Sequence, residues 1–205
     1  MENSYLTGNV LLNKAILFAV ERHAGQLRKG TTLPYIIHPL ETMTILSSMN
    51  ADSNLLIAGI LHDTLEDTTA TDSELIEIFG SDIYSLVKAH TEDKSQSWEV
   101  RKLHTIKELQ NSSLRVKMLV MADKVANLRS MYSDYRQVGE QLWERFNAPK
   151  EKQAWYYGQI RDALYEMQDY SDTADIYHEM IFLNMKLFER ITNSKTAFAC
   201  PLYHS

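Results

Sequence analysis

The sequence predicts an all-α fold, and three observations carry this prediction. Apolar residues recur at the three- and four-residue spacing of helices along most of the chain. No segment shows the sustained alternation of apolar and polar residues that is typical of strands. With 7 Gly and 4 Pro in 205 residues, the chain is poor in the turn residues that a loop-rich β architecture needs. We therefore expect a compact bundle of several helices.

The composition is that of a globular protein, with 44% hydrophobic and 23% charged residues. A net charge of -6 argues against electrostatic capture of nucleic acid. No apolar run approaches the roughly 20 residues of a membrane span, so no membrane association is expected. The N-terminus lacks the basic and then apolar pattern of a signal peptide. The single Cys200 excludes an internal disulfide and fits a reducing cytoplasm.

The first expected helix covers residues 9–24 and is mostly buried, because residues 15–20 are apolar nearly all round. Gly25 suits its end. His23 lies in its last turn, and we interpret this histidine as structural rather than as a ligand.

Two further helices are expected over 39–49 and 54–63, joined by a polar link. Pro39 suits the first helical position, which leaves His38 at the cap with its ring free to point inward. The second of these helices begins with the apolar run Leu55–Leu61 and heads into the interior.

The next helices are bounded by clear capping signals. A capping box at Thr71–Glu74 opens a helix that Gly80 ends, and another helix follows over 81–90. After a polar link over 92–97, an amphipathic surface helix is expected over 98–111.

The C-terminal part reads as a buried helix over 113–130, then helices over 134–146, 150–168 and 174–192, and an irregular tail over 193–205. We expect one domain over 1–168 and a C-terminal helical extension with its tail over 169–205. The last helix could pack on the domain or form a homo-oligomer by pairing with another subunit.

An imidazole and three carboxylates follow the apolar run of the central helix: His62, Asp63, Glu66 and Asp67. If the helix continues, residues four apart place these groups on adjoining strips of one face. Crowded carboxylates at the end of a buried helix repel each other and lose hydration, so they need a cation or much water. The pattern favours a metal site; the alternative is an exposed acidic helix end with an incidental histidine.

Asp123 strengthens the metal interpretation because it lies in the apolar helical run 116–128. A lone carboxylate there costs several kcal/mol unless something pairs with it. Lys124 and Arg129 could pair with it instead, which would make it a structural residue. Two histidines and two aspartates suit Mn, Fe, Zn or Mg-like ions. The predicted ligands are His38, His62, Asp63 and Asp123.

This order of residues resembles the HD superfamily of metal-dependent phosphohydrolases. The resemblance is to the (p)ppGpp hydrolase domain of RelA/SpoT enzymes and to the small alarmone hydrolases, which include the metazoan SpoT homologue. It covers about residues 10–165, although 133–150 cannot be matched. The segments that carry it are His23–Gly30, Pro34–Pro39, His62–Thr68, Phe79–Gly80, Thr91–Ser95, Arg101–Lys102 and Ala122–Arg129.

The resemblance implies an HD-domain bundle, to which the last helix is an addition. It implies hydrolysis of the 3′-diphosphate of ppGpp or pppGpp to GDP or GTP and pyrophosphate. Glu66 and Asp67 would orient the attacking water or carry its proton. One divalent metal ion is implied, with Mn²⁺ first and Fe, Zn, Ni or Mg compatible with the same ligands. The length of the chain leaves no room for a synthetase domain, so a stand-alone hydrolase is expected.

The substrate contacts follow from the same resemblance. Arg28 and Lys29 would contact phosphates, although the residues alone also fit a solvated turn. Asn127 would hold the ribose, and Lys124 would contact a phosphate or remain in an ion pair. The aromatic pair Tyr156–Tyr157 could line the nucleotide pocket or belong to the core.

Two other functions remain open at this point. The first is an HD-type phosphatase for another nucleotide, such as a dNMP or the 2′-phosphate of NADPH. The paired Arg28–Lys29 and Glu66–Asp67 count against a dNMP substrate but not against NADPH. The second is a catalytically inactive nucleotide-binding module, which a missing ligand or a missing Glu-Asp pair would favour. Neither is missing.

Overall fold

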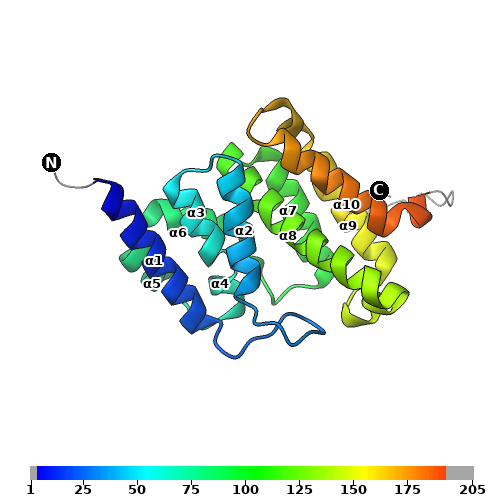
Figure 1. Ribbon diagram of the computed structural model, residues 1–205, viewed down its shortest axis with the longest axis horizontal. Coiled ribbons are helices and arrows are strands. Elements are labelled where there is room, and N and C mark those ends of the chain that lie inside the picture. The colour runs from blue at the N-terminus through cyan, green and yellow to red at the C-terminus, as the bar shows by residue number, and fades with distance from the viewer. Residues whose placement is uncertain (1–3, 193–205) are drawn as a thin grey trace.

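The structure is a computed structural model that describes residues 4–192, and the side chains of residues 10–188 within them. The predicted tail and Cys200 lie outside the described residues. The described chain is all-α, as predicted (Figure 1). Its elements are α1 (Ser4–Arg22), α2 (Ile37–Ser48), α3 (Ser53–Leu61), α4 (Thr64–Asp67), α5 (Asp72–Phe79), α6 (Ser81–His90), α7 (Trp98–Asn111), α8 (Leu114–Val138), the 3-10 helix η1 (Gly139–Arg145), α9 (Lys150–Ala163), the 3-10 helix η2 (Tyr165–Asp169) and α10 (Ala174–Thr192).

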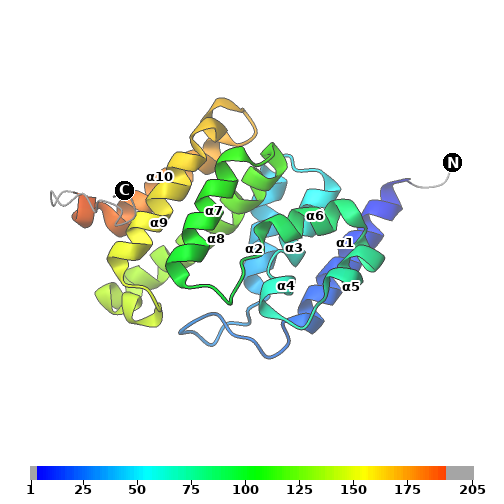
Figure 2. The ribbon, with the colours of Figure 1, turned by 180° about the vertical axis from the view of Figure 1, so that it is seen from behind.

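The helices form two groups that meet at α2 and α8. In Figure 1, α1, α5 and α6 lie with α3 on one side, and α7, α9 and α10 lie with α8 on the other. Figure 2 shows the same division from behind. The middle helix α2 packs against both α3 and α8. The loop between α1 and α2 projects along the lower edge in both views.

The central helix α3 is buried because its sequence is apolar on every side, from Leu55 to Leu61. It begins at a cap where the Asp52 carboxylate accepts a hydrogen bond from the Leu55 N–H. Gly59 allows α2 to approach closely, since a Cβ there would lie 2.5 Å from Leu46 Cδ1. The close pair α2–α3 brings the start of one helix beside the end of the other.

Local signals predicted the turn from α5 to α6 correctly. The Thr71 hydroxyl accepts a hydrogen bond from the Glu74 N–H, and the Glu74 carboxylate accepts one from the Thr71 N–H. Gly80 has a φ of 86°, which favours glycine, and it ends α5 as expected.

Several expected helix boundaries are wrong. Helix α1 begins at Ser4 rather than at residue 9. Helix α2 begins at Ile37, so His38 lies inside its first turn and not at the cap; Pro39 is accommodated because the first turn needs no N–H donors. Helix α3 ends at Leu61, and α4 restarts at Thr64.

The helices expected over 113–130 and 134–146 are largely one helix. Helix α8 runs without a break to Val138 and ends at Gly139, whose φ is 60°. Only η1 occupies the remainder of the second expected helix. The region 150–168 is divided at Leu164 into α9 and η2.

The last helix, α10, packs along α8 and α9. It buries Tyr177, Met180, Leu183, Leu187 and Phe188 in the core that the other helices share. Its assignment to a separate C-terminal extension stays a prediction. No helix among residues 4–192 is long and apolar enough to cross a membrane.

Candidate metal centre and active site

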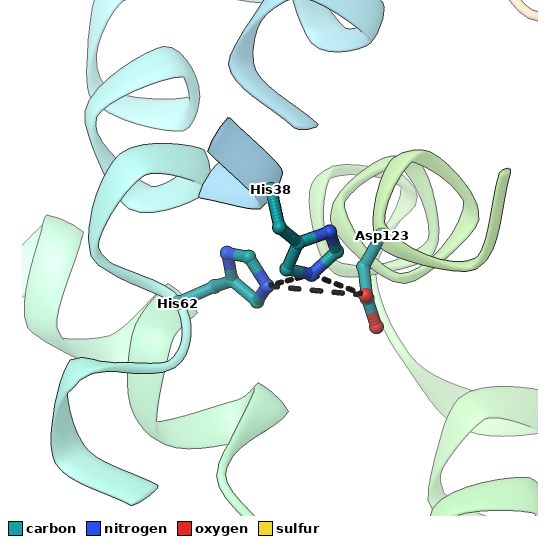
Figure 3. Close-up of side chains that lie close together, drawn as sticks. All are labelled: His38, His62 and Asp123. Atoms are coloured by element: carbon teal, nitrogen blue, oxygen red, sulfur yellow. Dashed lines mark hydrogen bonds and ion pairs between the residues drawn. The ribbon is translucent and has the colours of Figure 1, made fainter. Parts of the chain in front are cut away.

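Three predicted ligands meet where α2, α3 and α8 converge (Figure 3). His38 comes from the first turn of α2, His62 follows the last residue of α3, and Asp123 lies in the middle of α8. The two Nε2 atoms are 3.2 Å apart, and Asp123 Oδ1 lies 3.2 Å from His38 Nε2 and 3.9 Å from His62 Nε2. All three residues are at least 97% buried.

Asp63, the fourth predicted ligand, completes the cluster. Its Oδ2 lies 3.0 Å from His62 Nε2 and 3.6 Å from His38 Nε2. The Tyr35 hydroxyl donates a hydrogen bond to the same oxygen, at a distance of 2.5 Å. The break between α3 and α4 at His62 and Asp63 turns both side chains toward α2 and α8. A continuous helix, which the spacing argument assumed, is therefore not what gathers them.

The His62 ring is oriented from behind by the backbone. Its Nδ1 lies 2.7 Å from the carbonyl oxygen of Gly59, so Nδ1 carries a proton and donates it to that oxygen. This leaves Nε2 to face the cluster. An imidazole held in one tautomer by a backbone carbonyl is the arrangement that metal-binding histidines commonly show.

Burial and charge oppose each other at these residues. Burial alone would lower the pKa of His62, but the Asp63 carboxylate outweighs it and raises the pKa to about 9. Burial lowers the pKa of His38. Burial would raise the pKa of Asp63 and Asp123, but His62 beside the first and Lys124 beside the second hold both below the usual range.

These donors fit a divalent metal ion. One atom from each of His38, His62 and Asp123 lies within 4.8 Å of the other two. The facing Nε2 atoms can share at most one proton, whereas a cation would satisfy both of them and the carboxylate oxygens together. The set of imidazoles and carboxylates suits Mn²⁺, Fe²⁺ or Zn²⁺.

Glu66 borders the cluster, whereas Asp67 faces away from its centre. The Glu66 carboxylate is mostly buried, and Oε2 accepts a hydrogen bond from the Glu92 N–H at 3.1 Å. Burial raises the pKa of Glu66. The Asp67 carboxylate pairs with Lys94 and lies 3.5 Å from the Tyr35 hydroxyl. The two predicted catalytic residues thus occupy different surroundings.

The predicted substrate residues lie at increasing distance from the metal ligands. Asn127 donates to Asp123 Oδ1 at 2.6 Å, and its own carbonyl oxygen accepts a hydrogen bond from Arg28 at 3.2 Å. Lys29 is farther out and donates to the side chain of Asn147. Among the described residues, neither Arg28 nor Lys29 forms an ion pair with a carboxylate, so both charges are available to an anion.

Lys124 contacts both the metal-binding carboxylate and the aromatic pair of the core. Lys124 Nζ lies 2.6 Å from Asp123 Oδ2 and 5.7 Å from the centre of the Tyr156 ring. Lys102 Nζ lies 4.8 Å from the same ring centre. Tyr156 and Tyr157 are both buried in the core. The Tyr156 hydroxyl has no hydrogen-bond partner among the described residues.

A cavity of about 120 Å³ opens onto this cluster. It is lined by Tyr35, His38, Asp63, Glu66, His90, Glu92, Lys102, Thr105, Asp123, Lys124 and Asn127. Arg28 and Lys29 do not line it. His23, which we interpreted as structural, contacts Gln26 through Nδ1 at 2.8 Å and lies outside the cavity.

Sequence reasoning missed five residues that line the cavity: Tyr35, His90, Glu92, Lys102 and Thr105. Tyr35 and Glu92 lie in segments that carry the family resemblance, but nothing in their spacing indicated contact with the other residues. His90, the last residue of α6, had no signal of its own. Its Nε2 lies 3.2 Å from Asp123 Oδ2. Because α6 packs on α3 and α8, only the tertiary arrangement brings His90 to the site.

Comparison with known proteins identifies a family and several relatives of this chain. A family described as "HD domain" matches residues 15–151. The chain is 36% identical to the guanosine-3′,5′-bis(diphosphate) 3′-pyrophosphohydrolase MESH1 of Drosophila melanogaster, over 58% of this chain and 68% of that protein. The Xenopus tropicalis protein of the same name is 38% identical, over 59% of this chain and 69% of that protein. A GTP pyrophosphokinase of Myxococcus xanthus is 35% identical over 59% of this chain, which spans only 17% of that longer relative.

Solved structures agree with these matches. The structure of a metazoan orthologue of SpoT, described as hydrolysing ppGpp, superposes with a TM-score of 0.70 and 27% identity. That superposition covers 88% of this chain and 94% of the orthologue. A crystal structure of lmo0812 from Listeria monocytogenes superposes with a TM-score of 0.69 and 33% identity, covering 76% of this chain and 96% of that one.

Proposed function

The chain belongs to the HD domain family, and on this premise we propose that it hydrolyses the 3′-diphosphate of ppGpp or pppGpp. The products are GDP or GTP and pyrophosphate. The observation that carries the proposal is the buried cluster of His38, His62, Asp63 and Asp123, bordered by Glu66. The two MESH1 relatives, of which the chain covers more than two thirds, support this substrate.

Each described residue has a distinct task in the proposed reaction. A divalent ion bound by the four ligands would polarise a phosphoryl oxygen and lower the pKa of water. Asn127 and Arg28 form a hydrogen-bonded row that leads outward from Asp123, where the ribose and its phosphates would lie. Lys124, beside Asp123, offers a positive charge at the lining of the cavity.

Glu66 is the proposed proton acceptor. Its buried carboxylate has a raised pKa, which brings it closer to neutral pH, where a general base works best. The hydrogen bond from the Glu92 N–H holds one carboxylate oxygen in place. Water attacks the phosphorus that is esterified to the ribose 3′-oxygen, the bond from that phosphorus to the 3′-oxygen breaks, and Glu66 takes the proton from the water. The 3′-oxygen takes up a proton from solvent and leaves as the ribose hydroxyl, and the transferred group leaves as pyrophosphate.

Asp67 supports this step from outside the cavity. Its carboxylate holds Lys94, whose Nζ also lies 3.8 Å from Glu66 Oε1. We propose that this pair places a positive charge near the departing pyrophosphate. Asp67 then orients Lys94 and does not itself receive the proton.

The test compares the wild-type protein with Glu66→Gln on ppGpp, pppGpp, NADPH and a dNMP. Wild-type protein should release pyrophosphate from the guanosine substrates and leave the other two nearly untouched. Loss of the proton acceptor should lower kcat by about 100-fold or more. Glu99→Gln is the matched control, because Glu99 is an exposed glutamate of α7. Phosphate release from NADPH at a higher kcat/KM than from ppGpp would contradict the proposal.

Three finer features belong to the same proposal. Mn²⁺ is the proposed native ion, by resemblance to the alarmone hydrolases. The proposed location is the cytoplasm, because a chain with a single cysteine suits a reducing compartment. The C-terminal helix α10 exposes about half of Phe182 and Met185, a surface through which two copies could associate.

A further inference from the structure

His90 is buried at the edge of the metal cluster but is not one of its four expected ligands. It ends α6, and its side chain is 8% exposed. The centre of its ring lies 5.1 Å from that of His62. A donor atom from each of His62, Asp63 and His90 lies within 4.8 Å of the other two. His90 therefore shares two of its close neighbours with the predicted metal centre.

The carboxylate of Asp123 lies between two imidazoles. Oδ1 faces His38 Nε2 and Oδ2 faces His90 Nε2, each at 3.2 Å. Lys124 Nζ also lies 2.6 Å from Oδ2. Lys124 therefore gives this oxygen a charged donor that does not depend on His90.

Only one of the two ring nitrogens of His90, Nε2, has a hydrogen-bond or ion-pair partner among the described residues. Its Nδ1 is buried and makes no hydrogen bond with any residue in the described part of the chain. A buried imidazole whose only polar contact is the metal-binding carboxylate is poorly explained as a structural residue, since buried polar groups are normally satisfied. A cation bound between His62, Asp63 and Asp123 would give Nε2 a second partner beside Asp123 Oδ2.

We propose that His90 is a fifth ligand of the metal centre, which then offers three imidazoles and two carboxylates. The consequence is a change in metal preference. Added imidazole favours Zn²⁺, Fe²⁺ or Ni²⁺, whereas Mn²⁺ and Mg²⁺ prefer oxygen ligands. The chain should therefore bind Zn²⁺ relative to Mn²⁺ more tightly than the same centre without His90. This inference requires the metal site but not the proposed substrate.

The experiment measures metal affinity and the absorption spectrum of the Co²⁺-loaded protein for the wild type and two variants. His90→Ala removes the ligand, and His90→Gln keeps a side chain that can still donate a hydrogen bond to Asp123. We expect both variants to lower Zn²⁺ affinity by at least about 100-fold and Mn²⁺ affinity by no more than about 10-fold. Both should shift the Co²⁺ ligand-field bands. His178→Ala, which removes an exposed histidine of α10, should change neither quantity.

Three results would overturn the inference. The first is a Co²⁺ spectrum that is the same in His90→Ala and the wild type. The second is an equal loss of Zn²⁺ and Mn²⁺ affinity. The third is full metal affinity in His90→Gln, because His90 would then act only as a hydrogen-bond donor to Asp123. Circular dichroism of the metal-free proteins shows whether each variant is folded, and the glutamine variant serves if the alanine variant is not. If the metal-loaded wild-type protein does not hydrolyse ppGpp, the proposed substrate is wrong, but the metal-affinity and Co²⁺ measurements still test His90.

Discussion

Glu92 connects the catalytic cavity to helix α7, and its removal should destabilise the fold measurably. Its carboxylate accepts hydrogen bonds from Arg101 at 3.0 Å, Lys102 at 2.8 Å and the Thr105 hydroxyl at 3.1 Å. Its side chain is 10% exposed, and those of Arg101 and Lys102 are 21% and 17% exposed. In Glu92→Ala, two largely buried cations lose their carboxylate.

Breaking a buried ion pair by removing one partner costs about 3–5 kcal/mol. Water reaches part of both cations here, so we expect the free energy of unfolding to fall by about 2–3 kcal/mol. Urea unfolding, followed by circular dichroism, measures this difference. Because the Glu92 side chain also lines the cavity, kcat for ppGpp should fall with stability.

The matched control is Glu99→Ala, in the first turn of α7. Glu99 pairs with Lys152, but both side chains are about half exposed, so water replaces the lost contact. Glu99→Ala should therefore change the unfolding free energy very little. If Glu92→Ala were no more destabilising than Glu99→Ala, the carboxylate would not be the anchor of this network.

Three further predictions concern stability. Burial alone would raise the pKa of Glu92, but Lys102 and its neighbours outweigh it and hold the pKa below the usual range. The ionised Glu92 carboxylate should contribute its full stabilisation above the unfolded-state pKa of about 4.3 and lose it as pH falls through the lower folded-state pKa. The difference in unfolding free energy between wild type and Glu92→Gln, measured in urea, should therefore shrink in acid. Gly30 and Gly25 both have left-handed φ, but a Cβ at Gly30 alone overlaps Arg145, so Gly30→Ala should lower the melting temperature more than Gly25→Ala. Thr71→Ala removes the capping box of α5 and should lower the unfolding free energy by about 1 kcal/mol.

Each of these three has a contradicting result. A Glu92→Gln difference that stays constant from pH 7 to pH 3 would contradict the pKa assignment. Equal melting temperatures for the two glycine variants would show that the Arg145 side chain moves aside without any loss of stability. An unchanged unfolding free energy in Thr71→Ala would mean that water caps α5 equally well.

The parts of the fold that local chemistry determines were predictable from the sequence. The apolar run Leu55–Leu61 and the capping box at Thr71 specify their helices through neighbouring residues alone. The break at His62 and Asp63 was not predictable in this way, because the helical pattern continues through it. The extension of α8 to Val138 was also missed, although Gly139, with its positive φ, marks the end of that helix locally.

The site was partly predictable for a comparable reason. His62 and Asp63 are adjacent, and Asp123 interrupts an apolar run, so neighbouring residues are enough to identify each of them as a candidate ligand. His90 and Tyr35 reach the same site from segments with no such pattern. Their contribution depends on how α6 packs on α3 and how the loop before α2 folds. A short segment of sequence does not determine either arrangement.

The central claim is that this chain is a metal-dependent ppGpp hydrolase. It is tested most directly by pyrophosphate release from ppGpp by the metal-stripped protein, with and without added Mn²⁺, beside Asp63→Ala. We predict no release without metal, sustained release with Mn²⁺, and none from the variant at any Mn²⁺ concentration. Absence of release from folded, metal-loaded wild-type protein would contradict the claim, and so would undiminished release from Asp63→Ala.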